Sequence, residues 1–254
     1  MRNLTNNTNM QSHKFSHKYS LTAVALIAVL GLTGCSDDDD DTPTPEPITP
    51  AEPAVVMQTY TVTVTNLTAN QPMSPIAIAS HSADVMLWQA GEAANVALEK
   101  IAEGGDATDV ATIEGINTTV SGAGILMPGM SETITVTLNE ADVANLTVAT
   151  MLVNTNDAFT GLNGYDITML EVDDSVSMRG MVYDAGTEAN SEAKGTMPGP
   201  ADGGEGYNSE RDDVDFVHIH PGVITMYDGL MDSVLTPSHR FDNPAVAISI
   251  SRTE

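Results

Sequence analysis

The sequence predicts an all-β protein: an antiparallel β-sandwich of about eight strands, with one or two short helices in the connections. Three observations indicate this class. Several segments alternate apolar and polar residues with a period of two, which is the pattern of a half-buried strand. The segments between them are rich in glycine and proline. Aromatic residues make up only 4% of the chain while threonine and valine are frequent, which favours sheet over a helical bundle.

The alternation is clearest in residues 59–65, where apolar side chains occupy the even positions and threonines the odd ones, and residues 133–138 repeat it. Residues 146–153 are largely apolar on both faces, which predicts a central strand. Further strands are predicted over residues 167–172, 178–183, 216–220 and 245–251. An eighth, over residues 76–79, is expected at the edge of a sheet because Pro75 cannot donate to a ladder.

One helix is predicted over residues 92–103, and Gly104 and Gly105 follow it as a typical C-terminal cap. Residues 55–254 are predicted to form one β-sandwich domain, because this length suits a single core and no internal repeat divides it.

The first 34 residues are predicted to be a lipoprotein signal peptide. Residues 1–20 carry basic but no acidic side chains, and residues 21–32 form an apolar run too short for a bilayer, which needs about 20 residues. The run ends in a sequence that resembles the bacterial lipobox, Leu32-Thr33-Gly34-Cys35, in which the cysteine receives the lipid. The alternative is an ordinary signal peptide with an incidental cysteine. Lipidation would anchor the chain in the cell envelope, and Ser36 predicts the outer membrane if the host is Gram-negative.

Residues 35–54 are predicted to be an acidic, proline-rich tether. Five consecutive aspartates, 37–41, are followed by five prolines, and like charges and prolines both extend a chain. Calcium binding by the aspartate run is the alternative to a solvated spacer.

The charge balance excludes some classes of function. The chain has 35 acidic and 9 basic residues, a net charge of −26, which repels nucleic acid. Its single cysteine excludes a disulfide framework and a zinc site with several thiolates. No Gly-x-Ser-x-Gly elbow is present and Cys35 is assigned to the lipid, so we expect no nucleophilic catalysis and predict that the protein is not an enzyme.

Seven regions of the body occur in an order that resembles the spondin N-terminal domain family, in the form found in bacterial secreted proteins. They are residues 80–92, 101–106, 125–129, 151–161, 183–188, 216–220 and 243–246. Residues 156–159 (Asn-Asp-Ala-Phe) and 183–187 (Tyr-Asp-Ala-Gly-Thr) are the most specific. The resemblance implies an eight-stranded, C2-like β-sandwich with a calcium ion held by loops at one end. It also implies a non-catalytic role in adhesion or extracellular recognition, with an extracellular protein or glycan as the unknown partner.

The calcium carboxylates of that family map onto Asp157, Asp184 and Glu188. Calcium prefers about 6–8 oxygen ligands, and loop carbonyls after a strand can complete such a shell. Glu188 departs from the usual aspartate of the family, so it is expected to ligate differently or to weaken the site. Taken without the resemblance, Asp157 and Asp184 also suit turns, and Glu188 also suits a solvated surface.

His218 and His220 supply an alternative site. Two positions apart on a strand, they are predicted to face the same side, a geometry that suits zinc or copper. This would make the protein a transition-metal-binding protein or a metalloenzyme. The alternative is that both imidazoles form hydrogen bonds with loop backbone. A structural component of the envelope, with an acidic surface that controls hydration, is a third interpretation of the whole chain.

Overall fold

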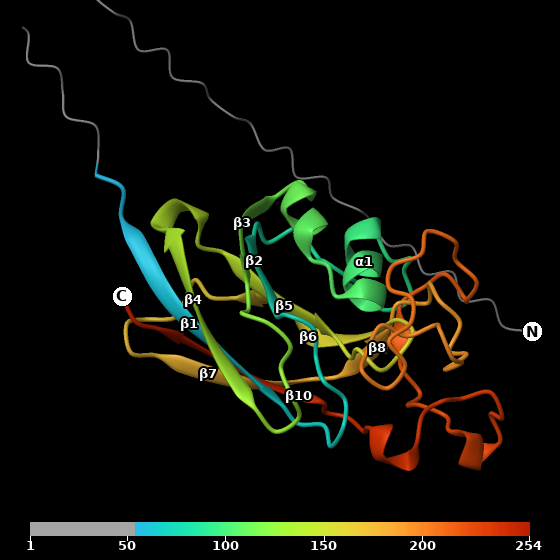
Figure 1. Ribbon diagram of the computed structural model, residues 1–254. Helices are drawn as coiled ribbons and strands as arrows, with labels where there is room; N and C mark the ends of the chain where they lie inside the picture. The colour runs from blue at the N-terminus through green and yellow to red at the C-terminus, as the bar shows by residue number, and fades with distance from the viewer. Residues whose placement is uncertain (1–53) are drawn as a thin grey trace, which may run out of the picture. The chain divides into compact units, whose positions relative to one another are not determined.

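The computed structural model describes residues 54–254 (Figure 1). The predicted signal peptide, Cys35 and all of the predicted tether except Ala54 lie outside the described residues. Within residues 54–254, none of the helices is long and apolar enough to cross a membrane.

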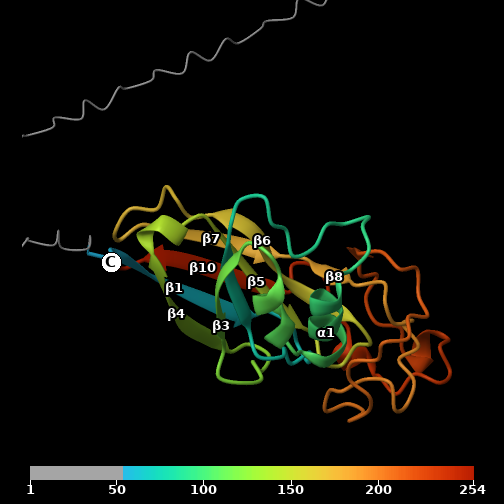
Figure 2. The same cartoon turned by 90° about the horizontal axis from the view of Figure 1, so that it is seen from above.

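The described chain forms ten β-strands in two antiparallel sheets, which confirms the predicted sandwich with two more strands than expected. The first sheet has the strand order β4-β1-β10-β7, and the second has the order β3-β2-β5-β6-β8-β9. The strands are β1 (Met57–Asn66), β2 (Ala77–His81), β3 (Ile116–Ser121), β4 (Ser131–Asn139), β5 (Asn145–Met151), β6 (Ala158–Asp166), β7 (Ser175–Gly180), β8 (Val182–Asp184), β9 (His218–Ile219) and β10 (Val246–Arg252). Apolar side chains from both sheets share one core, so the sheets form two packed layers (Figure 2).

The four-stranded sheet follows the predicted alternation. β1 lies between β4 and β10, and its threonines pair across the ladder with threonines and serines on the outer face. The inward side chains, all buried, are Tyr60, Val62 and Val64 of β1 and Ile134, Val136 and Leu138 of β4. The predicted strand over residues 245–251 is confirmed as β10.

The six-stranded sheet confirms one prediction and corrects another. β5 lies between β2 and β6 and is buried on both faces, as expected for a central strand. The prediction that residues 76–79 form an edge strand is wrong, because β2 lies between β3 and β5. Pro75 precedes the first paired residue, Ala77, so its missing N–H interrupts no ladder. β3, which the sequence did not indicate, occupies the edge.

The strand predicted over residues 167–172 is wrong, since this segment is a loop and the strand before it is β6. The sequence pattern did not predict β6, because two glycines, Gly161 and Gly164, interrupt it. A Cβ at Gly161 would overlap the carbonyl oxygen of Val148 on β5, so close approach of the two strands requires glycine there. Ile167 is nevertheless buried against the core, which explains its apolar character.

The segment over residues 178–183 is divided between the two sheets. β7 ends at Gly180 in the four-stranded sheet, and β8 begins at Val182 in the six-stranded sheet. The predicted strand over residues 216–220 is reduced to β9, two residues long.

The helix α1 (Val96–Gly104) begins later than predicted, because Asn95 caps it by accepting the amide of Leu98 at 2.9 Å. Gly105 closes it with a φ of 67°, and its amide donates to the carbonyl of Ile101, so the predicted cap is confirmed. Leu98 and Ile101 belong to the core cluster formed with Phe159 on one face of the six-stranded sheet. Short 3-10 helices cover Thr108–Thr112, Glu140–Asp142, Met226–Asp228 and Pro237–His239.

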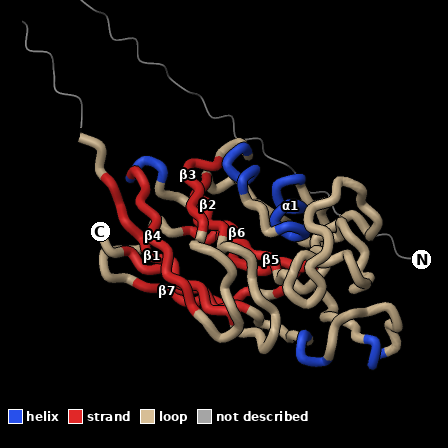
Figure 3. Tube along the Cα trace, in the orientation of Figure 1, coloured by secondary structure: helices blue, strands red, loops and turns tan. Residues whose placement is uncertain are grey.

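Long connections gather at the end of the sandwich where β8 lies (Figure 1), and they are the tan loops beside α1 in Figure 3. They comprise residues 185–217 and 220–245, and a small apolar cluster of Met197, Val223 and Leu235 lies within them. We refer to residues 184–245 as the loop end. It carries nearly all the ionisable groups described below.

Candidate metal centre

Asp157 and Asp184 are brought together by the pairing of β6 with β8. Asp157 immediately precedes β6, Asp184 is the last residue of β8, and Ala158 is the register partner of Asp184. Both aspartates are fully buried. Two of the three carboxylates assigned to calcium from the sequence therefore lie at one corner of the six-stranded sheet.

Asp157 has one satisfied and one unsatisfied oxygen. Its Oδ2 accepts the amides of Thr187 (2.8 Å) and Glu188 (3.1 Å) and the Thr187 hydroxyl (3.3 Å). Its Oδ1 is buried and has no hydrogen-bond partner among residues 54–254. Burial and then the negative charge of Asp184 hold the pKa of Asp157 well above its usual range, with a smaller contribution from Asp213. A bare, buried oxygen beside two other carboxyl groups is an environment that a cation would stabilise.

Three groups contact the Asp184 carboxylate: one backbone amide and two side chains. Its Oδ1 accepts the amide of Gly186 at 2.8 Å, and its Oδ2 accepts the Asn190 side chain at 2.6 Å. The Nε2 of His218 lies 3.3 Å from Oδ1. These contacts orient the carboxylate within the turn that follows β8.

Asp213 joins this pair, although the sequence did not single it out. One ligand atom from each of Asp184, Asp213 and His218 can be chosen so that all three lie within 4.8 Å of one another. Burial and the charge of Asp184 raise the pKa of Asp213. In the sequence Asp213 is one of four acids between positions 210 and 215, so no local pattern distinguishes it from its neighbours.

His218 presents a ring nitrogen to the carboxylates. Its Nδ1 lies 3.1 Å from the carbonyl oxygen of Ile219, which can only accept, so Nδ1 carries a proton. The Nε2 atom then faces Asp184 and Asp213, at 3.3 and 4.0 Å. Nε2 is therefore the ring nitrogen that is placed to bind a metal beside these carboxylates.

His220 lies on the same side as His218 but is engaged elsewhere. Its Nδ1 accepts the amide of Gly222 at 2.9 Å, which leaves the proton on Nε2, 3.1 Å from Oδ1 of Asn190. Burial lowers the pKa of His220 to about 4. Both ring nitrogens therefore have protein partners, and the nearer oxygen of Asp184 is 4.0 Å away.

Glu188 contributes its backbone to Asp157 but directs its side chain elsewhere. Its carboxylate accepts the Asn156 side chain at 2.9 Å. Burial raises the pKa of Glu188 to about 7, with charge contributions from Glu103, Asp212 and Glu205. The structure therefore brings together Asp157 and Asp184 with Asp213 and His218, and places the Glu188 carboxylate in a different acidic group.

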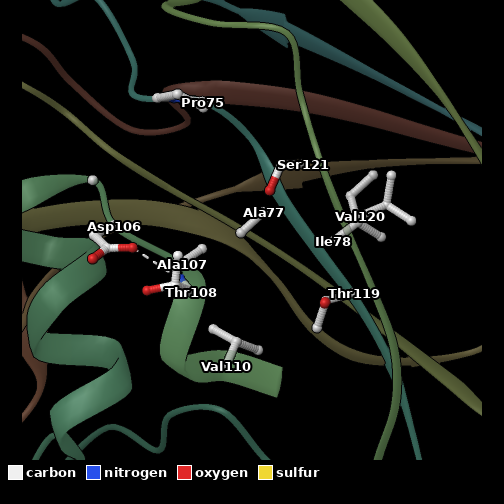
Figure 4. Close-up of a pocket in the computed structure, with 11 residues that line it drawn as sticks. Pro75, Ala77, Ile78, Asp106, Ala107, Thr108, Val110, Thr119, Val120 and Ser121 are labelled. Atoms are coloured by element: carbon white, nitrogen blue, oxygen red, sulfur yellow. Dashed lines mark hydrogen bonds between the residues drawn. The ribbon is translucent and has the colours of Figure 1, made fainter. Parts of the chain in front are cut away.

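A cavity of about 460 Å³ lies away from these residues, between the segment that follows α1 (residues 105–110) and the β2–β3 edge of the six-stranded sheet (Figure 4). Its lining is mostly apolar or hydroxyl-bearing, and Asp106 is its ionisable residue. Asp106 accepts the amide of Thr108 at 2.9 Å. This cavity offers no second titratable group and is not part of the centre.

Comparison with known proteins adds one match. A sequence model of the spondin N-terminal domain family (Spondin_N) matches residues 61–197, more than half of the chain. The matched region includes Asp157, Asp184 and Glu188 but ends before Asp213 and His218. No curated protein matches the chain.

Proposed function

The chain belongs to the spondin N-terminal domain family, and on that premise we propose that it is a calcium-binding module for adhesion or extracellular recognition, anchored by lipid to the cell envelope. The family is of a non-catalytic, extracellular type, which supports a binding role rather than an enzymatic one. The buried Asp157–Asp184 pair, with its unpartnered oxygen, is the observation that carries the calcium part of the proposal.

The residues present fit calcium. Asp184 and Asp213 offer hard carboxylate oxygens that lie close together, and Asp157 adds a buried Oδ1 that has no hydrogen-bond partner among residues 54–254. The pKa values of Asp157 and Asp213 are both raised, which means that burial and mutual repulsion disfavour the charged carboxylates that calcium requires. A divalent cation would remove that penalty, so we assign the ion to these three side chains.

Calcium should raise the stability of the protein, because it binds only the folded state. At a calcium concentration of 100 times Kd the gain is about 2.7 kcal/mol. The test is the melting temperature with CaCl₂ and with EDTA, for the wild type and for Asp157→Asn and Asp184→Asn. We expect the calcium-induced rise to be largely lost in both variants.

Glu171→Gln is the matched control, because Glu171 is an exposed acid outside the loop end. It should retain the full calcium response. Identical melting curves of the wild type in CaCl₂ and EDTA would remove calcium from the proposal while leaving the family assignment intact.

The anchor is proposed from the lipobox-like sequence ending at Cys35. Lipid on this cysteine would hold the domain at a membrane surface, in the outer membrane of a Gram-negative host, and expose it to an extracellular protein or glycan. The wild type should incorporate labelled palmitate and sediment with membranes, whereas Cys35→Ala should do neither. Unchanged labelling of the variant would overturn the anchor.

A transition-metal site is the second candidate function, favoured by the proximity of Asp184, Asp213 and His218. Two carboxylates and an imidazole are a ligand set that suits zinc or manganese. They suit calcium less well, because an imidazole nitrogen is a poor ligand for calcium. His220 would support this site through Asn190 rather than as a ligand, since both its nitrogens are engaged. Elemental analysis decides: stoichiometric metal in the wild type, lost in His218→Ala, would favour it, and metal-free protein would exclude it.

A further inference from the structure

The outer face of the four-stranded sheet carries side chains in regular rows that run across its strands. One row consists of three hydroxyl side chains from β1, β10 and β7: Thr63, Ser249 and Ser177. In the next row Thr65 of β1 is the register partner of Ala247 of β10, which in turn partners Arg179 of β7. Because the methyl group of Ala247 is shorter than its neighbours, a hollow of about 320 Å³ lies over it, lined by both rows.

A second hollow begins on the other side of Arg179. Its volume is about 430 Å³, and it lies between the end of β7, the middle of β6 and residues 86–90. Its lining includes Trp88, Tyr183 and the exposed side chain of Gln89. Arg179 lines both hollows, so they adjoin at this residue, where the chain passes from one sheet to the other. We refer to the two hollows together as the Arg179 groove.

The Arg179 groove is free of negative charge. None of the described residues that line it is an aspartate or a glutamate, although the chain has 35 of them. Arg179 itself is exposed and forms no ion pair or side-chain hydrogen bond within residues 54–254. The other three arginines of that range have protein partners: Arg211, Arg240 and Arg252. An unpaired cation on a surface without acids is complementary to an anionic ligand.

The chemistry of the groove matches a sugar chain that carries carboxylates. A guanidinium group can bind a carboxylate through two parallel hydrogen bonds, which favours arginine at such sites. The serine and threonine hydroxyls of the first hollow can donate and accept, as can the hydroxyls of a sugar. The second hollow adds the Gln89 amide, together with Trp88 and Tyr183, whose rings are apolar on their faces and polar at one end. Small-ligand sites typically combine such apolar lining with a few polar groups.

We propose that the Arg179 groove binds an acidic polysaccharide, with Arg179 on a carboxylate of one sugar unit and the two hollows on the neighbouring units. This inference rests on the proposed recognition function, whose partner it specifies as a glycan rather than a protein. It is independent of the metal centre, because none of the residues that line the groove lies in the loop end.

The fluorescence of Trp88 provides the test, because this residue lines the groove and is the single tryptophan of the chain. We expect oligogalacturonate, added at low salt in EDTA, to change the emission saturably. The methyl-esterified oligosaccharide has the same sugar chain without its charges and should bind about tenfold more weakly or worse. Isothermal titration repeats both measurements without relying on fluorescence, and EDTA keeps calcium out of them.

Two variants on different elements alter the charge of the groove. Arg179→Gln removes the cation and should weaken oligogalacturonate binding about tenfold or more. Ala90→Glu places a carboxylate in the second hollow and should weaken it in the same direction. Both side chains are exposed, so circular dichroism should show intact folding. Lys194→Gln is the matched control, because it removes an exposed cation outside the groove, and it should bind like the wild type.

The outcomes separate this inference from the calcium proposal. Weaker binding in both variants, with full binding in Lys194→Gln, supports the groove. Absence of binding by the wild type overturns it, as does equal binding of the charged and esterified sugars or an unchanged affinity in Arg179→Gln. None of these results bears on the melting response to calcium, and a protein that does not respond to calcium would still be expected to bind the sugar.

Discussion

The four-stranded sheet and the loop end of this protein bury different kinds of side chain. In β1, β4 and β10 the buried side chains are aliphatic or tyrosine except for two uncharged amides of β1, Gln58 and Asn66, and serine and threonine hydroxyls bond one another across the outer face. In the loop end the buried side chains include the carboxylates of Asp184 and Glu192, with Asp157 beside them. Apolar burial is indifferent to pH and ions, whereas a buried carboxylate is not. The stability of the four-stranded sheet should therefore be insensitive to pH and ions, whereas that of the loop end should depend on the charge state of its carboxylates.

Glu192 shows how the loop end depends on charged groups. It is 2% exposed, accepts the amide of Ile224 at 2.7 Å, and accepts the Ser233 hydroxyl at 3.1 Å. It thereby joins two segments of the loop end, which also share a small apolar cluster and the bridge between Ala193 and Ser233. Burial raises its pKa to about 7, so its charge changes near neutral pH.

The largest expected effect is in the four-stranded sheet. Ile250→Ala removes a fully buried side chain of β10 and should destabilise the protein by roughly 2–5 kcal/mol. Urea unfolding in CaCl₂ and in EDTA measures this, with Ser251→Ala on the outer face as the control. The loss should be the same in both conditions. A loss that depended on calcium would break the distinction between the two regions.

The next largest effect is the pH dependence of folding stability that we expect from Glu192 in the loop end. The unfolded chain releases this proton near the ordinary glutamate value of 4.5, and the folded chain releases it near 7. Between these values the folded state binds more protons, so stability without metal should fall as pH rises. The loss attributable to Glu192 is roughly 3 kcal/mol.

Glu192→Gln keeps the shape but cannot ionise. It can also keep both hydrogen bonds, since its oxygen can accept the Ile224 amide and its NH₂ can donate to the Ser233 hydroxyl. We expect a shallower fall in stability from pH 5 to pH 7.5 in EDTA, measured by urea unfolding, with Glu171→Gln behaving like the wild type. Some slope should remain, because the pKa values of Asp157 and Glu188 are also raised. An unchanged slope in Glu192→Gln would show that this carboxyl group does not limit the loop end.

The smallest expected effect is at the cap of α1, which packs on the six-stranded sheet and adjoins the loop end through Arg211. Asn95→Ala removes the acceptor for the Leu98 amide and should cost about 1 kcal/mol in thermal unfolding. Asn95→Asp keeps an acceptor and should retain most of the stability. If Asp destabilised as much as Ala, the bond from the Asn95 side chain to the Leu87 carbonyl would be the important one.

Sequence reasoning succeeded where a residue's partners lie in the same periodic pattern. The alternation in residues 59–65 and 133–138 predicted which side chains of β1 and β4 are buried, because a strand has only two faces. It failed at β6, where glycines required by contact with β5 resemble turn residues. It also failed at β2, which was predicted at an edge but lies inside the sheet, because the unpredicted strand β3 pairs with it. At the candidate centre it indicated Asp157, Asp184 and His218 but missed Asp213.

The sequence by itself determined the sandwich class, the buried face of the regular strands and the family, because these depend on local periodicity and on motifs that are contiguous in the chain. Only the tertiary structure decided which carboxylates share a site. Pairing of β6 with β8 places Asp157 beside Asp184, and the path of the following loop brings in Asp213 while it places the Glu188 carboxylate against Asn156. Charges interact through space, and spacing along an irregular loop does not fix that distance.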